Sequence, residues 1–231
     1  MHDFIFGIYP YITLTVLFLG SIIRYERDPF TWKTSSSQLL RRKQLVAGSI
    51  LFHLGVLIIF VGHFAGLLIP INIYDWLGVG HTFKQLLAMI AGGAAGVFAI
   101  IGLILLLHRR LTDARIRQTS SFADIALLWI LLIQLLLGMG TIPISAQHLD
   151  GHEMITFMNW ANGIITFDMA AASYIEHAHW IFKLHMFLGL TIFLIFPFTR
   201  LVHMLSAPIR YVTRPGYQIV RSRRSARNTA E

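Results

Sequence analysis

Residues Leu45 to Ile69 read LVAGSILFHLGVLIIFVGHFAGLLI, and this stretch decides the fold of the chain. Its 25 residues include no Asp, Glu, Lys or Arg, and a helix needs roughly 20 apolar residues to cross the hydrocarbon core of a bilayer. His53 and His63 lie inside it. An imidazole at that depth needs a partner, because hydrocarbon cannot replace its hydrogen bonds to water. The ten residues between them correspond to about 15 Å of helical rise, so two separate sites are predicted.

The composition of the whole chain is that of a membrane protein. Of its 231 residues 55% are hydrophobic and 13% are charged, and the mean hydropathy is +0.64. Ordinary soluble domains have more charge and less apolar content. The chain has no cysteine, which excludes disulfides, cysteine-ligated iron–sulfur clusters and cysteine catalysis within it.

Apolar stretches predict an all-α integral membrane protein that forms one membrane domain over residues 1–231. Five spanning helices are expected, at about residues 4–23, 45–69, 86–107, 122–142 and 179–205. Residues 143–178 are too polar to span and too apolar for a plain linker, so we expect one or two amphipathic helices at the outer interface. Residues 206–231 form a basic tail. The first span lacks the basic region and cleavage site of a signal peptide, so it is expected to be retained.

The positions of the cations predict the orientation. Seventeen of the 19 Lys and Arg residues fall in the connection after the first span, in the connection after the third, or from Arg200 onward. Only Lys84 and Lys183 fall toward the other side. The positive-inside rule then places the N-terminus outside and the C-terminus in the cytoplasm. The formal net charge of +8 therefore favours a bilayer and an acidic protein partner over nucleic acid.

The last span supplies partners for the two histidines of the second. His185 lies near its outer end and His203 near its inner end. The two spans run in opposite directions, so His53 is expected to face His203 on the cytoplasmic side and His63 to face His185 on the outer side. Two histidine pairs at different depths between facing helices are how a helix bundle holds two b-type haems.

Haem suits this arrangement better than zinc, because a tetrahedral zinc site needs its ligands close together. The alternative for each histidine is a hydrogen bond to a neighbouring helix. The axial spacing of the two histidines differs between the second and the last span. On continuous helices the axial rise is about 15 Å between His53 and His63 but about 27 Å between His185 and His203.

Glycines accompany the histidines. Gly48, Gly55 and Gly62 recur every seven residues, which predicts a groove along one face that serves either close helix packing or a flat cofactor. Gly62 beside His63, and Gly189 one turn after His185, are expected to give clearance for a porphyrin edge.

Three polar residues in the spans have simpler interpretations. Arg200 precedes His203 by one turn and either neutralises a haem propionate or anchors the helix at the interface. Asp124 in a first helical turn suits the helix dipole and is expected to be structural. Gln134 is expected to form an interhelical hydrogen bond.

Dense motifs along nearly the whole chain, from about Gly7 to about Tyr217, resemble the gamma (cytochrome b) subunit of membrane-bound respiratory nitrate reductase. The motifs are GIYPY (7–11), FHLGVLIIFVGHF (52–64), AGGAAGV (91–97), TIPISAQHLDG (141–151) and LHMFLGLTIFLIFPFTRLVH (184–203). The resemblance implies a multi-pass anchor in a bacterial cytoplasmic (inner) membrane for an iron–sulfur beta subunit and a molybdenum catalytic alpha subunit on the cytoplasmic side. It also implies a role in nitrate respiration and nitrate assimilation.

The same resemblance implies roles for individual residues. The haem held by His53 and His203 would be proximal to the iron–sulfur subunit, and the haem held by His63 and His185 would be the distal one. Menaquinol or ubiquinol would be oxidised near the distal haem, and Lys84 and Gly62 match positions of the family's quinol site. From its sequence position alone, Lys84 lies just before the third span, where it could also be an ordinary interfacial lysine.

Two other functions remain as alternatives. A dihaem cytochrome b of a hydrogenase or formate dehydrogenase would share the histidines, although the motifs around Gln147 and Phe198 argue against it. A transporter with a histidine proton relay would carry no chromophore, and it would more naturally show broken helices or an internal repeat.

Overall fold

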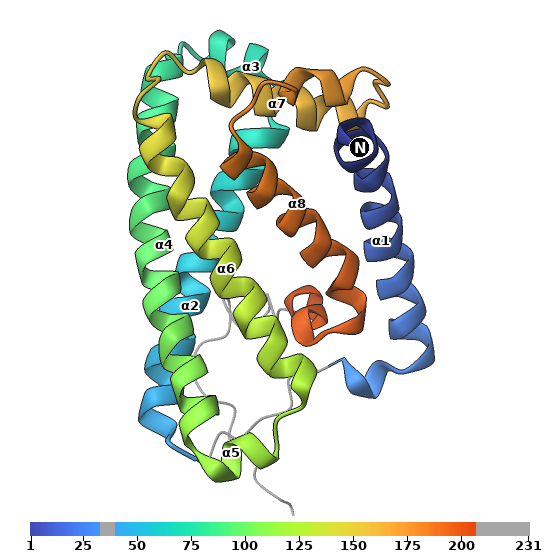
Figure 1. Ribbon diagram of the computed structural model, residues 1–231, viewed down its shortest axis with the longest axis vertical. Helices are drawn as coiled ribbons and strands as arrows, with labels where there is room; N and C mark the ends of the chain where they lie inside the picture. Colours follow the sequence, from blue (N-terminus) through green and yellow to red (C-terminus); the bar gives the residue numbers. More distant parts are fainter. Residues whose placement is uncertain (33–39, 207–231) are drawn as a thin grey trace, which may run out of the picture.

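The computed structural model describes residues 1–32 and 40–206, and within these ranges the chain is helical and has no strand (Figure 1). In this part of the chain, five helices are long and apolar enough to cross a membrane: Phe4–Arg27, Arg42–Leu68, His81–Thr112, Phe122–Ser145 and Trp180–Phe198. The predicted all-α, five-span architecture is therefore confirmed. Lys33 and residues 207–231 of the predicted basic tail lie outside the described residues.

The elements follow one another as a bundle with short pieces at its ends. In chain order they are η1 (Phe4–Ile8), α1 (Tyr9–Arg27), η2 (Pro29–Thr31), α2 (Arg42–His63), η3 (Phe64–Leu68), α3 (Ile71–Trp76), α4 (His81–Thr112), α5 (Ala114–Gln118), α6 (Phe122–Ser145), α7 (His152–Ile165), η4 (Ala171–Ile175), α8 (Trp180–Ile195), η5 (Phe196–Phe198) and η6 (Arg200–Ser206).

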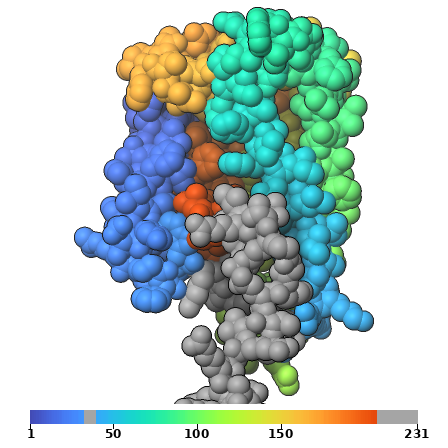
Figure 2. Space-filling model, turned by 180° about the vertical axis from the view of Figure 1, so that it is seen from behind, coloured from blue at the N-terminus to red at the C-terminus, as the bar shows by residue number. Residues whose placement is uncertain are grey.

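The spanning helices pack in the order α2, α4, α6, α8 and α1. α2 packs along α4, α4 packs on α6, and α8 packs on α1 and α6. The short helix α3 and helix α7 cover the end of the bundle where the N-terminus lies, and α5 lies at the opposite end (Figure 1). We call these the α7 end and the α5 end. The face of the molecule that is turned away from the viewer in Figure 1 is hollowed between α1 and α2, with α8 at the floor of the hollow (Figure 2).

The α2–α4 contact is made by glycines. A Cβ on Gly48 would lie 3.1 Å from the carbonyl oxygen of Gly102, and one on Gly102 would lie 2.7 Å from the carbonyl oxygen of Gly48. A Cβ on Gly55 would meet the backbone of Ala95 and Ala99. These glycines therefore serve close helix packing, one of the two roles expected for them.

Helices α4 and α6 are longer than predicted. α4 begins at His81 and ends at Thr112, about one turn beyond each expected boundary, so Lys84 lies within its first turn and not before it. α6 continues through Pro143 to Ser145, where we expected it to end at Ile142. A proline near the C-terminal end of a helix removes only one hydrogen bond, and the remaining turn is short enough to tolerate that loss.

The last span departs most from its prediction. The α-helix ends at Ile195, and residues up to Ser206 continue as the two 3-10 segments η5 and η6. Pro197 has no N–H to donate to the carbonyl of Phe193, and the N–H of Phe196 bonds that carbonyl instead in the tighter 3-10 pattern. His203 consequently lies on a 3-10 segment and not on the same helix as His185.

The predicted interfacial connection contains two helical elements, α7 and η4, as expected. Trp160, Ile164 and Ile175 from these elements are buried in one apolar cluster with Phe6. The Trp160 Nε1–H donates to the carbonyl of Phe6 at 2.9 Å. The connection therefore ties the start of the chain to the α7 end of the bundle.

Candidate functional site

The four histidines of α2 and the last span form two pairs. The ring centroids of His53 and His203 lie 6.1 Å apart with an interplanar angle of 70°. Those of His63 and His185 also lie 6.1 Å apart, with an angle of 47°. Each ring faces the partner that the opposite directions of the two spans predict.

The mismatch in axial spacing disappears because the last span is not one α-helix. The expected rise of about 27 Å assumed 1.5 Å per residue through residue 203. The chain leaves the α-helix at Ile195 and turns at the end of α8 (Figure 1). This turn through η5 and η6 brings the His203 ring beside His53.

Three of the four rings have a fixed tautomer. The Nδ1 of His53 bonds the carbonyl of Ser49 at 2.7 Å, and the Nδ1 of His63 bonds the carbonyl of Ile59 at 2.9 Å. The Nδ1 of His203 bonds the carbonyl of Arg200. A carbonyl only accepts, so Nδ1 carries the proton and the lone pair of Nε2 is left for a metal ion. Metal-bound histidines commonly show this pattern.

The ring of His185 is held differently, by contact with α6. Its Nδ1 is buried and has no hydrogen-bond partner among the described residues. A Cβ on Gly138 would lie 2.9 Å from its Cε1. One turn away, the Gln134 amide donates to the carbonyl of His185 at 3.1 Å, which is the interhelical bond expected for that residue.

Gly62 and Gly189, the two glycines expected to give room for a cofactor, have different surroundings. A Cβ on Gly62 would meet no atom within 4 Å, so the space beside His63 is open. A Cβ on Gly189 would lie 3.1 Å from the Gln134 amide nitrogen. Gly189 therefore lies at the α6–α8 contact, and its clearance for a porphyrin edge stays a prediction.

The distances within each pair fit one iron between two imidazoles. A metal–imidazole bond is about 2.0–2.1 Å long, and adding the distance from each nitrogen to its ring centre gives a centroid separation of about 6 Å. Each pair supplies two nitrogens, and residues 1–32 and 40–206 contain no group of three or more His, Cys, Asp or Glu side chains that could hold a metal ion. A porphyrin supplies the four remaining ligands itself, so the donor set fits haem.

Lys84 lies near the α7 end and is buried. Its ammonium nitrogen lies 2.9 Å from the Met158 sulfur and 3.6 Å from the centroid of the Tyr74 ring. The Tyr74 hydroxyl donates at 2.7 Å to the carbonyl of Ala65, two residues after His63. Burial raises the pKa of Tyr74, so its ring is a neutral π face for the cation. These contacts connect Lys84 to the segment that follows His63.

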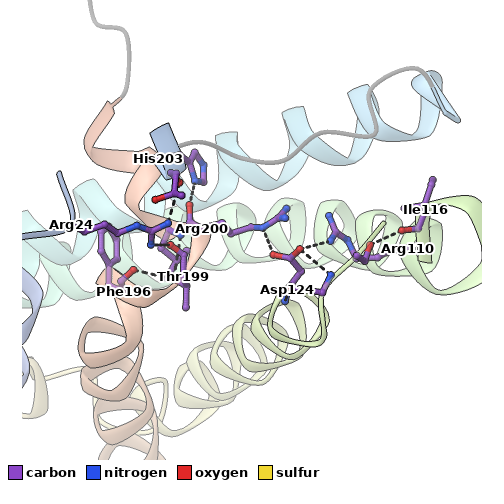
Figure 3. Close-up of polar contacts among 12 residues, drawn as sticks. Arg24, Arg110, Ile116, Asp124, Phe196, Thr199, Arg200 and His203 are labelled. Carbon is purple, nitrogen blue, oxygen red and sulfur yellow. Dashed lines mark hydrogen bonds and ion pairs between the residues drawn. The ribbon is translucent and has the colours of Figure 1, made fainter. Parts of the chain in front are cut away.

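Arg200 is part of an ionic network at the α5 end (Figure 3). Its Nε donates to the Asp124 carboxylate at 2.7 Å, and Arg110 lies 3.4 Å from the same carboxylate. Asp124 also completes a capping box with Ser121, so the structural role expected for it is confirmed. Arg24 of α1 donates to the carbonyls of Pro197 and Thr199 at 2.6 and 2.8 Å.

Several of these neighbours could not be assigned from the sequence. Tyr74 and Met158 lie in connections with no motif of their own, and they meet Lys84 only in the folded chain. The position of Asp124 indicated that it has a partner, since a carboxylate inside a predicted span needs one. The sequence could not identify that partner, Arg200, which lies 76 positions away.

The fold and the site define a class: a multi-pass helical membrane protein with two histidine pairs stacked between two of its spans. Comparison with known sequences then gives the family. The family model described as nitrate reductase gamma subunit matches residues 2–223, and the chain belongs to that family.

Three similar proteins match this chain over nearly their whole length. The chain is 52% identical to the respiratory nitrate reductase 2 gamma chain of Escherichia coli K12, over 97% of this chain and 98% of that one. It is 49% identical to the respiratory nitrate reductase 1 gamma chain of the same organism, over 96% and 98%. Identity to the nitrate reductase gamma chain of Bacillus subtilis is 41%, over 95% and 97%. These names refer to nitrate reductase and in two cases to respiration; none mentions assimilation, hydrogenase or formate dehydrogenase.

Proposed function

We propose that this chain is the dihaem cytochrome b subunit of a respiratory nitrate reductase, which oxidises quinol near the outer face of a bacterial inner membrane and passes electrons inward. The observation that carries the proposal is the pair of 6.1 Å histidine contacts at two levels of one bundle. Family membership favours this function over a hydrogenase or formate dehydrogenase subunit and over a proton transporter.

The four histidines would hold the haems. His53 and His203 would bind the proximal haem nearer the α5 end, and His63 and His185 would bind the distal haem nearer the α7 end. When bound, the haems supply the one-electron chemistry that no side chain of this protein offers. The backbone carbonyls that accept from Nδ1 of three ligands orient the rings and increase the basicity of Nε2.

Lys84 and Gly62 form the quinol site near the distal pair. The Lys84 ammonium is held by a π face and a thioether, which is a weak acceptor. A quinone oxygen or a haem propionate is a better acceptor, so Lys84 can exchange the sulfur contact for one of them. Gly62 leaves the space next to His63 open because it has no side chain.

The orientation follows from the charges of the described residues. The α5 end carries Arg24, Arg27, Arg41, Arg42, Lys43, Arg109, Arg110, Arg115, Arg117 and Arg200, whereas the α7 end has only Lys84 and Lys183. The positive-inside rule places the α5 end in the cytoplasm, where the iron–sulfur and molybdenum subunits would bind.

Quinol loses two electrons and two protons, and the protons leave at the outer face. Each electron moving inward opposes the membrane potential by about 2.3 kcal/mol per 100 mV, so energy is conserved.

A reduced-minus-oxidised absorption spectrum of the purified protein, combined with haem extraction, tests the proposal. We expect two b-type haems per chain, one for each histidine pair. A preparation that folds and inserts into membranes without any b-type haem would show the proposal to be wrong. Copurification with a molybdenum subunit would identify nitrate as the final acceptor.

A small change on α6 should disturb the distal pair. The Gly138→Ala methyl would lie 2.9 Å from Cε1 of His185, and such overpacking costs about 1–3 kcal/mol. If the cost falls on ligation, the affinity for the distal haem drops by roughly 5- to 150-fold. Haem content and the separate spectral signals of the two haems measure this effect.

Gly140→Ala is the matched control. Its methyl would meet only the flexible end of Ile181, which lies one turn before His185 on α8. We expect this variant to retain both haems. Equal haem loss in the two variants would contradict a specific contact between Gly138 and His185.

A further inference from the structure

His203 lies on η6, a 3-10 segment at the end of the described chain, so a regular helix does not fix its position. The segment is held from two other helices. Arg24 of α1 holds the chain just before it, through the carbonyls of Pro197 and Thr199. Asp124 of α6 holds its first residue, through the side chain of Arg200 (Figure 3).

The Asp124 contact leads directly to the ring of His203. The carboxylate binds the Nε of Arg200, and the carbonyl of the same Arg200 accepts from Nδ1 of His203. Two hydrogen bonds and one residue therefore separate the carboxylate from the imidazole. A shift of the Arg200 backbone would move the acceptor that orients the ring.

The anchor itself is firmly placed. The side chains of Asp124, Arg200 and Arg110 are 16%, 19% and 13% exposed, so water competes little for these ion pairs. The backbone N–H of Asp124 donates to the Ser121 hydroxyl at 3.1 Å, and the backbone N–H of Ser121 donates to the Asp124 carboxylate at 3.4 Å, which fixes the carboxylate on the first turn of α6. Arg110 from α4 binds the second carboxylate oxygen.

We propose that Asp124 is a positioning residue for the proximal haem ligand His203, acting through the side chain and carbonyl of Arg200. The proposal rests on the function proposed above, because it assumes that His203 binds haem. It also changes the expected role of Arg200, whose guanidinium contacts the Asp124 carboxylate in this structure and whose carbonyl orients the ligand.

The effect on the haem has a definite sign. A hydrogen bond from Nδ1–H to a carbonyl makes the imidazole more basic and stabilises ferric iron. Loss of the Asp124 contact loosens that bond, so the ferric form becomes less favoured and the potential of the proximal haem rises. We expect about a tenfold change in the ferric-to-ferrous ratio at fixed ambient potential, which is about 59 mV for a one-electron couple.

The test is a redox titration of both haems in membranes that contain the full complex, with electron paramagnetic resonance of each ferric haem. Asp124→Asn removes the charge at constant size, and Asp124→Glu keeps the charge but moves it by one methylene. Asp113→Asn is the control, because the Asp113 carboxylate binds Arg41 and accepts from the backbone N–H of Arg115 at the start of α5.

Asp124→Asn should raise the potential of the proximal haem only, and Asp124→Glu should change its resonance signal, which depends on the orientation of the two imidazoles. Asp113→Asn should change neither haem. An unchanged proximal haem, or equal shifts of both haems, would overturn the proposal. A potential shift in Asp124→Asn with an unaltered signal in Asp124→Glu would assign the effect to charge alone and also overturn it. If Asp124→Asn fails to assemble, the signal of Asp124→Glu decides.

These outcomes are distinct from failure of the proposed function. Wild-type protein without b-type haem would remove the premise. Wild-type protein with two haems, together with an Asp124 variant identical to it, would leave the cytochrome function intact and refute only the positioning role.

Discussion

The His63→Ala variant is expected to retain one haem and to lose quinol oxidation. In the proposed function His63 and His185 hold the distal haem, and alanine leaves His185 without its partner ring in that pair. Loss of even an outer-shell partner of a metal ligand lowers affinity or activity by 10- to 100-fold. Removing the ligand itself should therefore reduce quinol oxidation by more than about 100-fold. Haem extraction and quinol-dependent nitrate reduction in membranes measure the two effects.

His177→Ala is the control, because His177 is exposed in the connection before α8 and lies outside both pairs. It should retain two haems and full activity. If His63→Ala also retained both haems, the assignment of His63 and His185 to the distal haem would be refuted.

The Gly102→Ala variant is expected to lose stability and to disturb His53. Its methyl would collide with backbone atoms of Phe52 and Gly48, which have no flexible side chain that could move aside. Helix α2 must then shift away from α4, and His53 follows Phe52 directly. Overpacking of this kind costs about 1–3 kcal/mol, so we expect a fall in Tm of about 2–12 °C and weaker binding of the proximal haem.

Gly92→Ala on the same helix is the matched control, since its methyl would meet no atom within 4 Å. Thermal unfolding of the purified protein, followed through the haem absorption, compares the two variants. Similar melting temperatures for Gly102→Ala and the wild type would show that α2 and α4 are not locked at this contact.

The errors in the helix boundaries have a common physical origin. Hydropathy locates the apolar stretch that must lie in lipid, but a helix continues into water for as long as its hydrogen bonds are satisfied. α4 therefore runs from His81 to Thr112, past the apolar residues at both ends. Proline acts according to its surroundings: α6 passes through Pro143, whereas α8 ends two residues before Pro197. The carbonyls released near Pro197 are bound by Arg24, a partner that no local pattern indicates.

The glycines of α2 also show what local sequence patterns cannot predict, here for single residues. Their spacing in α2 predicted a groove, and the structure divides that groove by function. Gly48 and Gly55 contact the backbone of α4, whereas Gly62 faces open space beside His63. Spacing places the three on one face, but the packing of α4 along only part of α2 decides which of them is buried.

The sequence by itself determined the five spans, the family resemblance and the identity of the four paired histidines. Those features depend on apolar length and on the cost of placing an imidazole in hydrocarbon, and both can be read from local composition. Only the tertiary structure decided how His203 reaches His53, because the end of α8 and the path of η6 depend on contacts from α1 and α6. It also decided that Lys84 is held by Tyr74 and Met158. Contacts between residues distant in sequence exist only once the helices have packed.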